Sequence, residues 1–289
     1  MSSSRIVSVF GATGQQGASV VQSLLKDGTF SARAITRDPK SEAALKLQQQ
    51  GAEVVQADTV DKASLVNALR GSEAVFMVTL STFPPYSPEK PSEITVGKNI
   101  IDAAKELTGG KYTQVSLYDD KEVIEEYLKA SGIVNASLHL GSFTENLWTQ
   151  KQLKKTDTSL NITVAKFTPT ARQSFTWVGH DVGESALALL KNYTDSSKNI
   201  SGKTYPVVTA NMSFPDLATI ISKALGKDVT FTSIPSTGHP VFDEMCAAQT
   251  EYNGFYTSTP IPNPDLTALG AKFGTIEEFV ETELKKRYQ

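Results

Sequence analysis

The chain has 289 residues and a formal net charge of −3, and its single cysteine, Cys246, excludes an intramolecular disulfide. This length allows one large α/β domain or two lobes that share a core, and we favour the second. No run rich in Lys and Arg is present, so we expect no direct binding of nucleic acid. No stretch approaches the roughly 20 apolar residues that span a bilayer, so we expect no membrane association. We expect a soluble cytoplasmic protein without a signal peptide, and the nucleus stays open as a second location.

The first predicted elements are a buried strand over 6–10, a glycine-rich turn and an amphipathic helix. Gly11 allows a sharp exit from the strand, and Gly14 lets the backbone approach a pyrophosphate. Gly17 lets the helix pack closely on the sheet. Unpaired N–H groups at the helix start favour an anion. A glycine turn without a ligand is the alternative, but the strand before it and the helix after it favour a nucleotide site.

Residues 31 to 80 continue the alternation of strands and helices. Strands are expected over 31–38, 53–58 and 73–80, and helices over 40–51 and 63–71, the second capped by Asp61. This order predicts an α/β fold, a doubly wound parallel Rossmann sheet with its ligand at the carboxyl ends of the strands.

Residues 81–91 contain four prolines and are expected to form a loop, a candidate lid, at this edge. Later elements are expected as helices over 94–107, 122–132, 181–192 and 213–226 and strands over 134–140 and 203–209. In the helix over 122–132, four apolar residues are expected on one face: Val123, Ile124, Tyr127 and Leu128.

Ser213 with Asp216 and Thr275 with Glu278 have helix-start spacing, the second as a capping box. After residue 150 the regular alternation of strands and helices gives way to shorter predicted elements. We therefore expect a Rossmann domain over 1–150 and a smaller C-terminal α+β lobe for substrate or partner over 151–289, with segments of this lobe open to return to the sheet.

Several segments together resemble the NmrA-like family of atypical short-chain dehydrogenase/reductases. They are the glycine motif, Thr36-Arg37-Asp38-Pro39, the helix that begins at Lys121, GSFTENL over 141–147 and WVGHDVGESALALL over 177–190. The resemblance covers nearly the whole chain. It implies either an NADP(H)-binding regulator or an NADPH-dependent reductase.

The end of the second predicted strand indicates which dinucleotide is preferred. An NAD site usually carries an acidic side chain there, whereas this chain has Thr36 and Arg37. The Arg37 guanidinium is suited to a 2′-phosphate, so we expect NADP, with a solvated surface arginine as the alternative. Asp58 matches the family position near the adenine amino group, or instead caps the following helix. The expected cofactor-binding residues are Gly11, Thr13, Gly14, Gln15, Gln16, Gly17, Arg37, Asp58, Thr79 and Lys121.

The catalytic residues that the resemblance implies are incomplete. In this superfamily a tyrosine donates a proton to a carbonyl, assisted by a lysine four residues later. Lys121 matches the lysine, but Leu117 stands four residues before it and has no proton to give. Tyr118, three residues before, is the remaining candidate donor. Loss of the donor resembles the sensor branch, whereas in relatives of the isoflavone-reductase type the lysine itself assists, which would make Lys121 the acid or base.

Lys121 is expected to hold the ribose hydroxyls of the cofactor. A cation in a first helical turn opposes the helix dipole by about 0.3 to 1 kcal/mol, so helix stabilisation does not explain it. The alternative is a solvated lysine near Asp119 and Asp120. Only sixteen positions separate Lys105 from Lys121, fewer than is usual in the family. Either residues 111–117 supply the fifth strand, which we favour, or the sheet is short here.

The expected substrate side is formed by Phe83, His139, Phe143, Asn146 and Trp148. These aromatic residues are equally suited to packing within the lobe. No metal-ligand spacing and no G-x-S-x-G elbow is present, so metal and serine chemistry are set aside. Two functions remain: reduction of a small carbonyl or enone compound with NADPH, which we favour, and a non-catalytic NADP sensor that contacts a regulatory protein such as a transcription factor.

Overall fold

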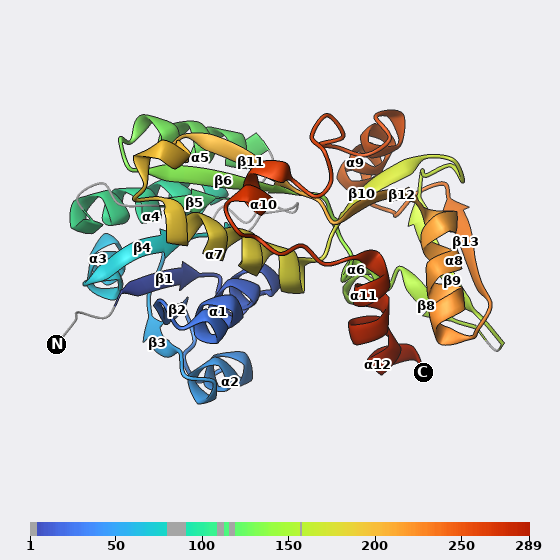
Figure 1. Ribbon diagram of the computed structural model, residues 1–289, viewed down its shortest axis with the longest axis horizontal. Helices are drawn as coiled ribbons and strands as arrows, with labels where there is room; N and C mark the ends of the chain where they lie inside the picture. The colour runs from blue at the N-terminus through green and yellow to red at the C-terminus, as the bar shows by residue number, and fades with distance from the viewer. Residues whose placement is uncertain (1–4, 80–90, 109–112, 116–118, 157) are drawn as a thin grey trace. The chain divides into compact units, whose positions relative to one another are not determined.

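The computed structural model describes residues 5–79, 91–108, 113–115, 119–156 and 158–289 (Figure 1). The chain divides into two compact units. The first unit comprises Met1–His139, Val182–Tyr205 and Ala268–Ala271. The second unit comprises Leu140–Asp181, Pro206–Thr267 and Lys272–Gln289. Segments from the later part of the chain thus belong to the first unit. The loop was expected over 81–91, and its residues 81–90 lie outside the described residues.

A seven-stranded sheet forms the centre of the first unit, in the order β11-β6-β5-β4-β1-β2-β3. The strands are β1 (Ile6–Phe10), β2 (Ser31–Thr36), β3 (Glu53–Gln56), β4 (Ser72–Phe76), β5 (Thr113–Val115), β6 (Asn135–Leu140) and β11 (Lys203–Val207). Every neighbouring pair from β3 to β6 is parallel. The order 3-2-1-4-5-6 is that of a doubly wound Rossmann sheet, so the predicted fold class is confirmed.

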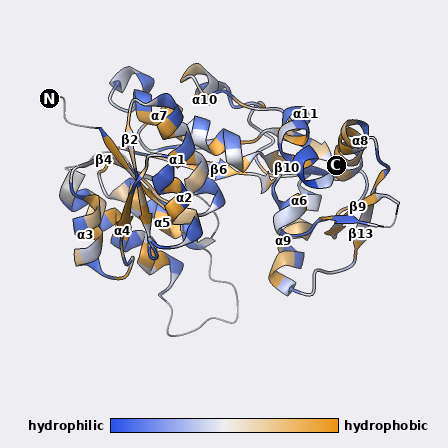
Figure 2. Cartoon of the chain, turned by 90° about the horizontal axis from the view of Figure 1, so that it is seen from below, coloured by the Kyte–Doolittle hydropathy of each residue, from blue (hydrophilic) through white to orange (hydrophobic). Residues whose placement is uncertain are grey.

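Helices cover both faces of this sheet (Figure 1). They are α1 (Gln15–Asp27), α2 (Glu42–Gln49), α3 (Lys62–Leu69), α4 (Glu93–Thr108), α5 (Asp119–Ala130) and α7 (Gly183–Asn192). Helix α1 packs beside α7, while α3, α4 and α5 pack in that order on the other face. Figure 2 shows the central strands in the hydrophobic colour, as expected for strands that are covered on both sides. In a sheet of this type, ligands bind at the edge formed by the carboxyl ends of the strands.

The described part of the short interval before Lys121 supplies the fifth strand. Residues 113–115 form β5, which pairs with β4 on one side and β6 on the other. The prediction for α5 was wrong at one residue. Val123 is 45% exposed, whereas Ile124 and Leu128 are fully buried. The reason is geometric: positions 124 and 128 lie one turn apart on the covered face, and position 123 is rotated about 100° away.

Glu125 on α5 connects three elements of the first unit. Its carboxylate is 2.8 Å from Nε2 of His139 on β6, and it accepts a hydrogen bond of 2.6 Å from the Thr204 hydroxyl on β11. Lys129 adds an ion pair at 3.1 Å. Burial raises the pKa of Glu125, but these partners outweigh burial and lower it to about 2. The carboxylate is therefore stabilised in its charged form.

We expect Glu125→Gln to lose stability in a pH-dependent way. A carboxyl pKa lowered from 4.5 to about 2 contributes about 3 kcal/mol above the unfolded-state pKa, and this is lost as the pH falls from about 4.5 toward 2. Urea unfolding should show a large difference from wild type at pH 6 and a smaller one at pH 3. Glu126→Gln, at an exposed neighbouring site, should cost little at either pH. If Glu125→Gln lowers the free energy of unfolding by the same amount at pH 6 and pH 3, the lowered pKa of Glu125 is contradicted.

The second unit contains two small sheets and the helices that pack on them. Its strands are β7 (Ser142–Phe143), β8 (Leu153–Lys155), β9 (Leu160–Ala165), β10 (Arg172–Thr176), β12 (Ala210–Ser213) and β13 (Val229–Ile234), in the orders β12-β10-β7 and β13-β9-β8. Its helices are α6 (Asn146–Thr149), α8 (Phe214–Leu225), α9 (Pro240–Glu251), α10 (Pro264–Ala268), α11 (Ile276–Phe279) and α12 (Lys285–Tyr288). Phe214 lies at its core, edge-on to Phe167 and Phe175. Capping boxes start α8 and α11.

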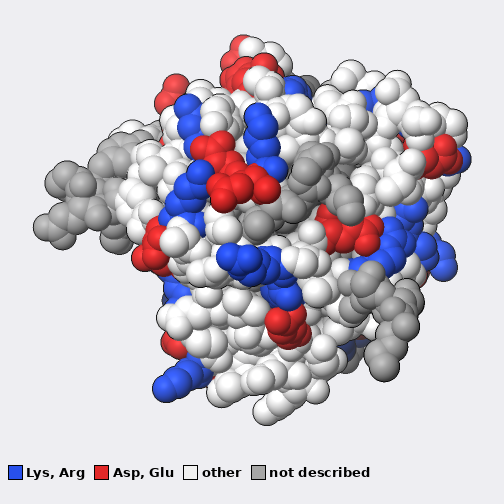
Figure 3. Space-filling view, turned by 90° about the vertical axis from the view of Figure 1, so that its left-hand side faces the viewer, with Lys and Arg blue, Asp and Glu red and all other residues white. Residues whose placement is uncertain are grey.

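The surface carries charges of both signs. On the face shown in Figure 3, Lys and Arg side chains alternate with Asp and Glu side chains among the described residues. Within the described ranges, no helix combines the length and the apolar character needed to cross a bilayer.

Candidate functional site

The glycine turn between β1 and α1 is shaped by close backbone approaches. Gly11 has φ +65°, and a Cβ there would lie 2.4 Å from Cγ1 of Val78. A Cβ on Gly17 would lie 2.3 Å from the carbonyl oxygen of Gly11. Only glycine at position 17 lets the first turn of α1 touch the preceding loop. The local sequence thus places the start of α1 directly against the end of β1.

The start of α1 is suited to an anion. Its N-cap, Gly14, makes no side-chain cap, and its first turn contains no acidic residue. Thr13, Gly14 and Gln15 are exposed. The N–H of Gly14 donates to the carbonyl oxygen of Gly11 at 2.9 Å, so the N–H groups left for a ligand are those of the first turn of α1, from Gln15 onward. Oε1 of Gln16 is buried and has no hydrogen-bond partner among the described residues. A glycine cradle and an unsatisfied buried acceptor fit the diphosphate and hydroxyl groups of a dinucleotide.

Arg37 and Asp58 follow β2 and β3 at the same edge of the sheet, and both are exposed. Among the described residues, the Arg37 side chain has no carboxylate partner, and its backbone carbonyl accepts a hydrogen bond from Gln56. Asp58 accepts a hydrogen bond of 3.0 Å from the N–H of Val60. Asp61, not Asp58, caps α3, so the predicted Asp61 cap is confirmed and the alternative of Asp58 as the cap is wrong. Contact of Arg37 and Asp58 with a cofactor stays a prediction.

Lys121, in the first turn of α5, lies in a buried polar cluster with Thr79 and Glu93. Its Nζ donates to the carbonyl oxygen of Thr79 at 2.8 Å and to the Thr79 hydroxyl at 3.2 Å. It also forms a short ion pair with Oε1 of Glu93. Because Gly11 closely approaches Val78, the residue before Thr79, this cluster adjoins the glycine turn. The structure thus brings together Thr79 and Lys121 beside the predicted cofactor loop.

The alternative that Lys121 is a solvated lysine is wrong. Its side chain is 8% exposed, and that of Glu93 is 1% exposed. Burial lowers the pKa of the Lys121 ammonium, although Glu93 and Asp120 act to raise it. A buried lysine with a lowered pKa beside a ligand loop is a common feature of functional sites. The other catalytic candidate, Tyr118, lies outside the described residues, as does Leu117.

Sequence reasoning missed Glu93. The predicted loop ended at residue 91 and the predicted helix began at residue 94, so Glu93 was assigned to neither. The structure makes it the first residue of α4. A carboxylate at a helix start is stabilised by the helix dipole. An acidic residue directly before an apolar helix was the available signal.

The expected substrate residues divide between the two units. His139 belongs to the first unit and contacts Glu125. Phe143, Asn146 and Trp148 belong to the second unit, where Trp148 stacks on Phe279 at 5.6 Å between ring centroids. This stacking matches the packing alternative for Trp148, while contact of these residues with a substrate stays a prediction. Phe83 lies outside the described residues.

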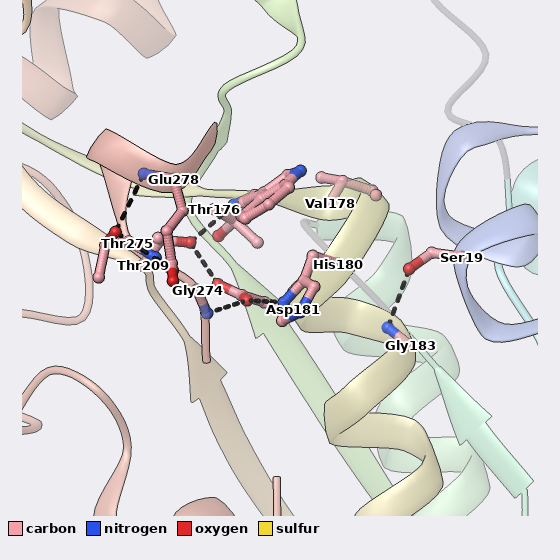
Figure 4. Close-up of polar contacts among 12 residues, drawn as sticks. Ser19, Thr176, Val178, His180, Asp181, Gly183, Thr209, Gly274, Thr275 and Glu278 are labelled. Atoms are coloured by element: carbon pink, nitrogen blue, oxygen red, sulfur yellow. Dashed lines mark hydrogen bonds and ion pairs between the residues drawn. The ribbon is translucent and has the colours of Figure 1, made fainter. Parts of the chain in front are cut away.

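Hydrogen bonds hold the segment over 177–183 in place (Figure 4). Asp181, which is fully buried, accepts hydrogen bonds from the N–H of Gly274 at 2.9 Å and from the Thr209 hydroxyl at 2.5 Å. Its carboxylate is also 2.8 Å from Nδ1 of His180. Within the first unit, Gly183 donates to the Ser19 hydroxyl at 3.1 Å and lies against α1. These contacts explain the residues of the segment over 177–183 as structural, without a ligand.

A shallow cavity of about 400 Å³ lies on the second unit. It is lined by Arg172, Asn211, Thr257, Thr259, Pro260 and Ile261. None of the predicted site residues lines it, and we assign it no role. Among the described residues, no cluster of three or more His, Cys, Asp or Glu side chains could hold a metal ion.

The sheet order and the glycine turn define a Rossmann-type α/β protein. The model of the NmrA-like family matches residues 3–108 and 106–280. The chain therefore belongs to the NmrA-like family. This confirms the resemblance that the sequence motifs indicate.

Curated relatives carry the name of an oxidoreductase. The NmrA-like family domain-containing oxidoreductase notA' of Aspergillus versicolor is 41% identical over 145 residues, which cover 44% of this chain and 41% of the relative. This relative and two similar ones are matched over 34–48% of their own lengths. The chain thus matches less than half the length of these relatives.

Solved structures share the fold. NmrA, a negative transcriptional regulator in complex with NADP, is similar with a TM-score of 0.78 and 18% identity, over 99% of this chain and 97% of that one. The NADPH-dependent quinone oxidoreductase QOR2 of Escherichia coli, complexed with NADPH, gives a TM-score of 0.70 and 24% identity, over 95% and 98%. At these identities the likeness shows the fold alone.

Proposed function

We propose that this protein is an NADPH-dependent reductase of a small carbonyl or enone compound. The observation that carries the proposal is Lys121, a buried ammonium beside the glycine turn at the carboxyl edge of the sheet. A proton donor at this edge is what carbonyl reduction needs next to a dinucleotide. The relatives named as oxidoreductases and the quinone oxidoreductase complexed with NADPH support the same chemistry.

The residues of the first unit have distinct roles in this proposal. Backbone N–H groups of Gln15 to Gly17 bind the diphosphate, and Arg37 binds the 2′-phosphate. Bound NADPH supplies the hydride. Lys121 holds the ribose hydroxyls and supplies or relays the proton that neutralises the developing alkoxide or enolate.

A turnover screen tests the proposal directly. NADPH oxidation would be followed at 340 nm with quinones, enones and aldehydes as substrates, and calorimetry would measure NADPH binding separately. Saturable turnover of at least one class is the expected result. Tight NADPH binding with no turnover across the panel would overturn the reductase.

A non-catalytic NADP sensor is the second candidate function. Leu117 stands where the superfamily has its proton-donating tyrosine. The neighbour NmrA is described as a negative transcriptional regulator. A sensor would bind NADP tightly without turnover, and its contact with a regulatory protein would depend on the oxidation state of the nicotinamide.

Arg37→Ala tests the assignment of NADP. We expect the Kd for NADPH to rise about 10- to 100-fold, because one charge-assisted contact worth about 1.5 to 3 kcal/mol is lost. The Kd for NADH should change less than about twofold, since NADH has no 2′-phosphate. Arg70→Ala is the matched control. This exposed arginine precedes the amino end of β4, at the opposite edge of the sheet, and should leave both constants unchanged. If Arg37→Ala raises the Kd for NADPH and the Kd for NADH by the same factor, the assignment of NADP is contradicted.

A further inference from the structure

Three elements of the first unit meet at the Lys121 ammonium. Thr79 follows β4, Glu93 is the first residue of α4, and Lys121 is in the first turn of α5. All three residues are at most 7% exposed. The ammonium therefore sits at the junction of one strand end and two helix starts, and its position depends on the partners found there.

The hydrogen bonds of the cluster account for every proton of the ammonium. A lysine ammonium has three donors, and Nζ of Lys121 has three acceptors: the Thr79 carbonyl, the Thr79 hydroxyl and Oε1 of Glu93. The Thr79 hydroxyl donates in turn to the same Oε1 at 2.5 Å. The carboxylate of Glu93 thus fixes both the ammonium and the hydroxyl that the ammonium contacts.

The charges explain why a carboxylate is needed. Burial and the start of α5 both disfavour a cation at Lys121. Glu93 is the charged group in direct contact with the ammonium, and among the described residues Asp120 on α5 is the other charge that acts on it. Glu93 itself benefits from its place at the start of α4. The ion pair therefore favours the charged form of the buried lysine and acts against burial, which lowers its pKa.

We propose that Glu93 is the positioning residue of Lys121, which holds the ammonium charged and in place for a dinucleotide ribose and a substrate oxygen. This inference rests on the proposed function for its catalytic consequence, but not for the state of the lysine. A new acceptor can reach the ammonium only by replacing one of the three present acceptors. The Thr79 hydroxyl, at 3.2 Å, is the longest of these contacts and is the one exchanged, while Glu93 stays in contact.

The test measures the Lys121 pKa in the protein without cofactor, from the Cε and Hε shifts of ¹³C-labelled lysine against pH, assigned with Lys121→Met. Glu93→Gln should lower this pKa relative to wild type, because the carboxylate that raises it is gone. Glu93→Asp keeps the charge with a shorter reach, so its value should lie between the two. If Glu93→Gln does not fold, the comparison of Glu93→Asp with wild type supplies the same test.

Glu73→Gln is the matched control. Glu73 is a largely buried carboxylate at the amino end of β4, paired with Arg5 at 2.7 Å. The variant Glu73→Gln should leave the Lys121 pKa unchanged. The inference is overturned if Glu93→Gln is folded and Lys121 titrates as in wild type, or if Glu73→Gln lowers the Lys121 pKa equally.

Turnover gives a second readout. With a substrate from the screen, Glu93→Gln should lower kcat by at least about tenfold with little change in KM, and the alkaline limb of its pH profile should move to lower pH. A lowered Lys121 pKa without any turnover in wild type would uphold the role of Glu93 and reject the reductase. If wild type turns over a substrate but the Lys121 pKa is unchanged in Glu93→Gln, the reductase is upheld and the role of Glu93 is rejected.

Discussion

Lys121→Ala is expected to lower turnover strongly and to destabilise the fold at the same time. A positioned proton donor contributes about 10²- to 10⁴-fold to the rate, so kcat should fall by that factor, while the Kd for NADPH should rise less than about tenfold. The substitution also leaves Glu93 buried without its cation. Removal of one partner of a buried pair typically costs about 3 to 5 kcal/mol in the free energy of unfolding. Stopped-flow NADPH oxidation and urea unfolding measure the two effects.

The double variant Lys121→Met with Glu93→Gln separates chemistry from folding. It removes both charges and keeps side chains of similar size, so most of the lost stability should return. Its kcat should stay as low as that of Lys121→Ala, because no ammonium is present. Recovery of turnover in the double variant would contradict a role of Lys121 in the reaction, and a Lys121→Ala protein as stable as wild type would contradict the buried pair.

Gly17→Ala is expected to have the largest effect on cofactor binding. The added Cβ would lie 2.3 Å from the carbonyl oxygen and 2.6 Å from the carbonyl carbon of Gly11, and backbone atoms cannot move aside as a flexible side chain can. Helix α1 must shift from the turn, which disrupts the cradle of N–H groups. Loss of two charge-assisted hydrogen bonds of about 1.5 kcal/mol or more each corresponds to at least about a 100-fold rise in the NADPH Kd. Calorimetric titration measures this rise.

Two further glycine variants control for misfolding. Gly28 ends the same helix at φ +75°, and a Cβ there would meet no atom within 4 Å. Gly28→Ala should therefore lower stability by about 1 kcal/mol through backbone strain and leave the NADPH Kd unchanged. At Gly14 the new Cβ would lie 3.3 Å from the Gly11 carbonyl oxygen, so Gly14→Ala should fold and still bind NADPH more weakly. Normal NADPH affinity in folded Gly17→Ala would refute the proposed cradle.

The candidate site could be predicted in part. The glycine turn, Thr79 and Lys121 were all selected from the sequence, and the structure places Thr79 and Lys121 in contact beside the turn. Glu93 was missed because 28 positions separate it from Lys121 and nothing local couples the two. The contact exists because β4, α4 and α5 end or begin at the same edge of the sheet. Such a pair follows from chain topology and not from any single segment.

The sequence by itself determined the local elements and the fold class. Strand β1 with its glycine turn, the Asp61 cap and the helix start at Thr275 depend on residues within a few positions of one another, so their signals are readable in a short window. The tertiary structure alone decided which charges meet and which are buried. The sequence identifies Lys121 as a candidate cofactor lysine but does not show its burial or its pairing with Glu93, because the cost of burying a charge depends on partners that are distant in the chain.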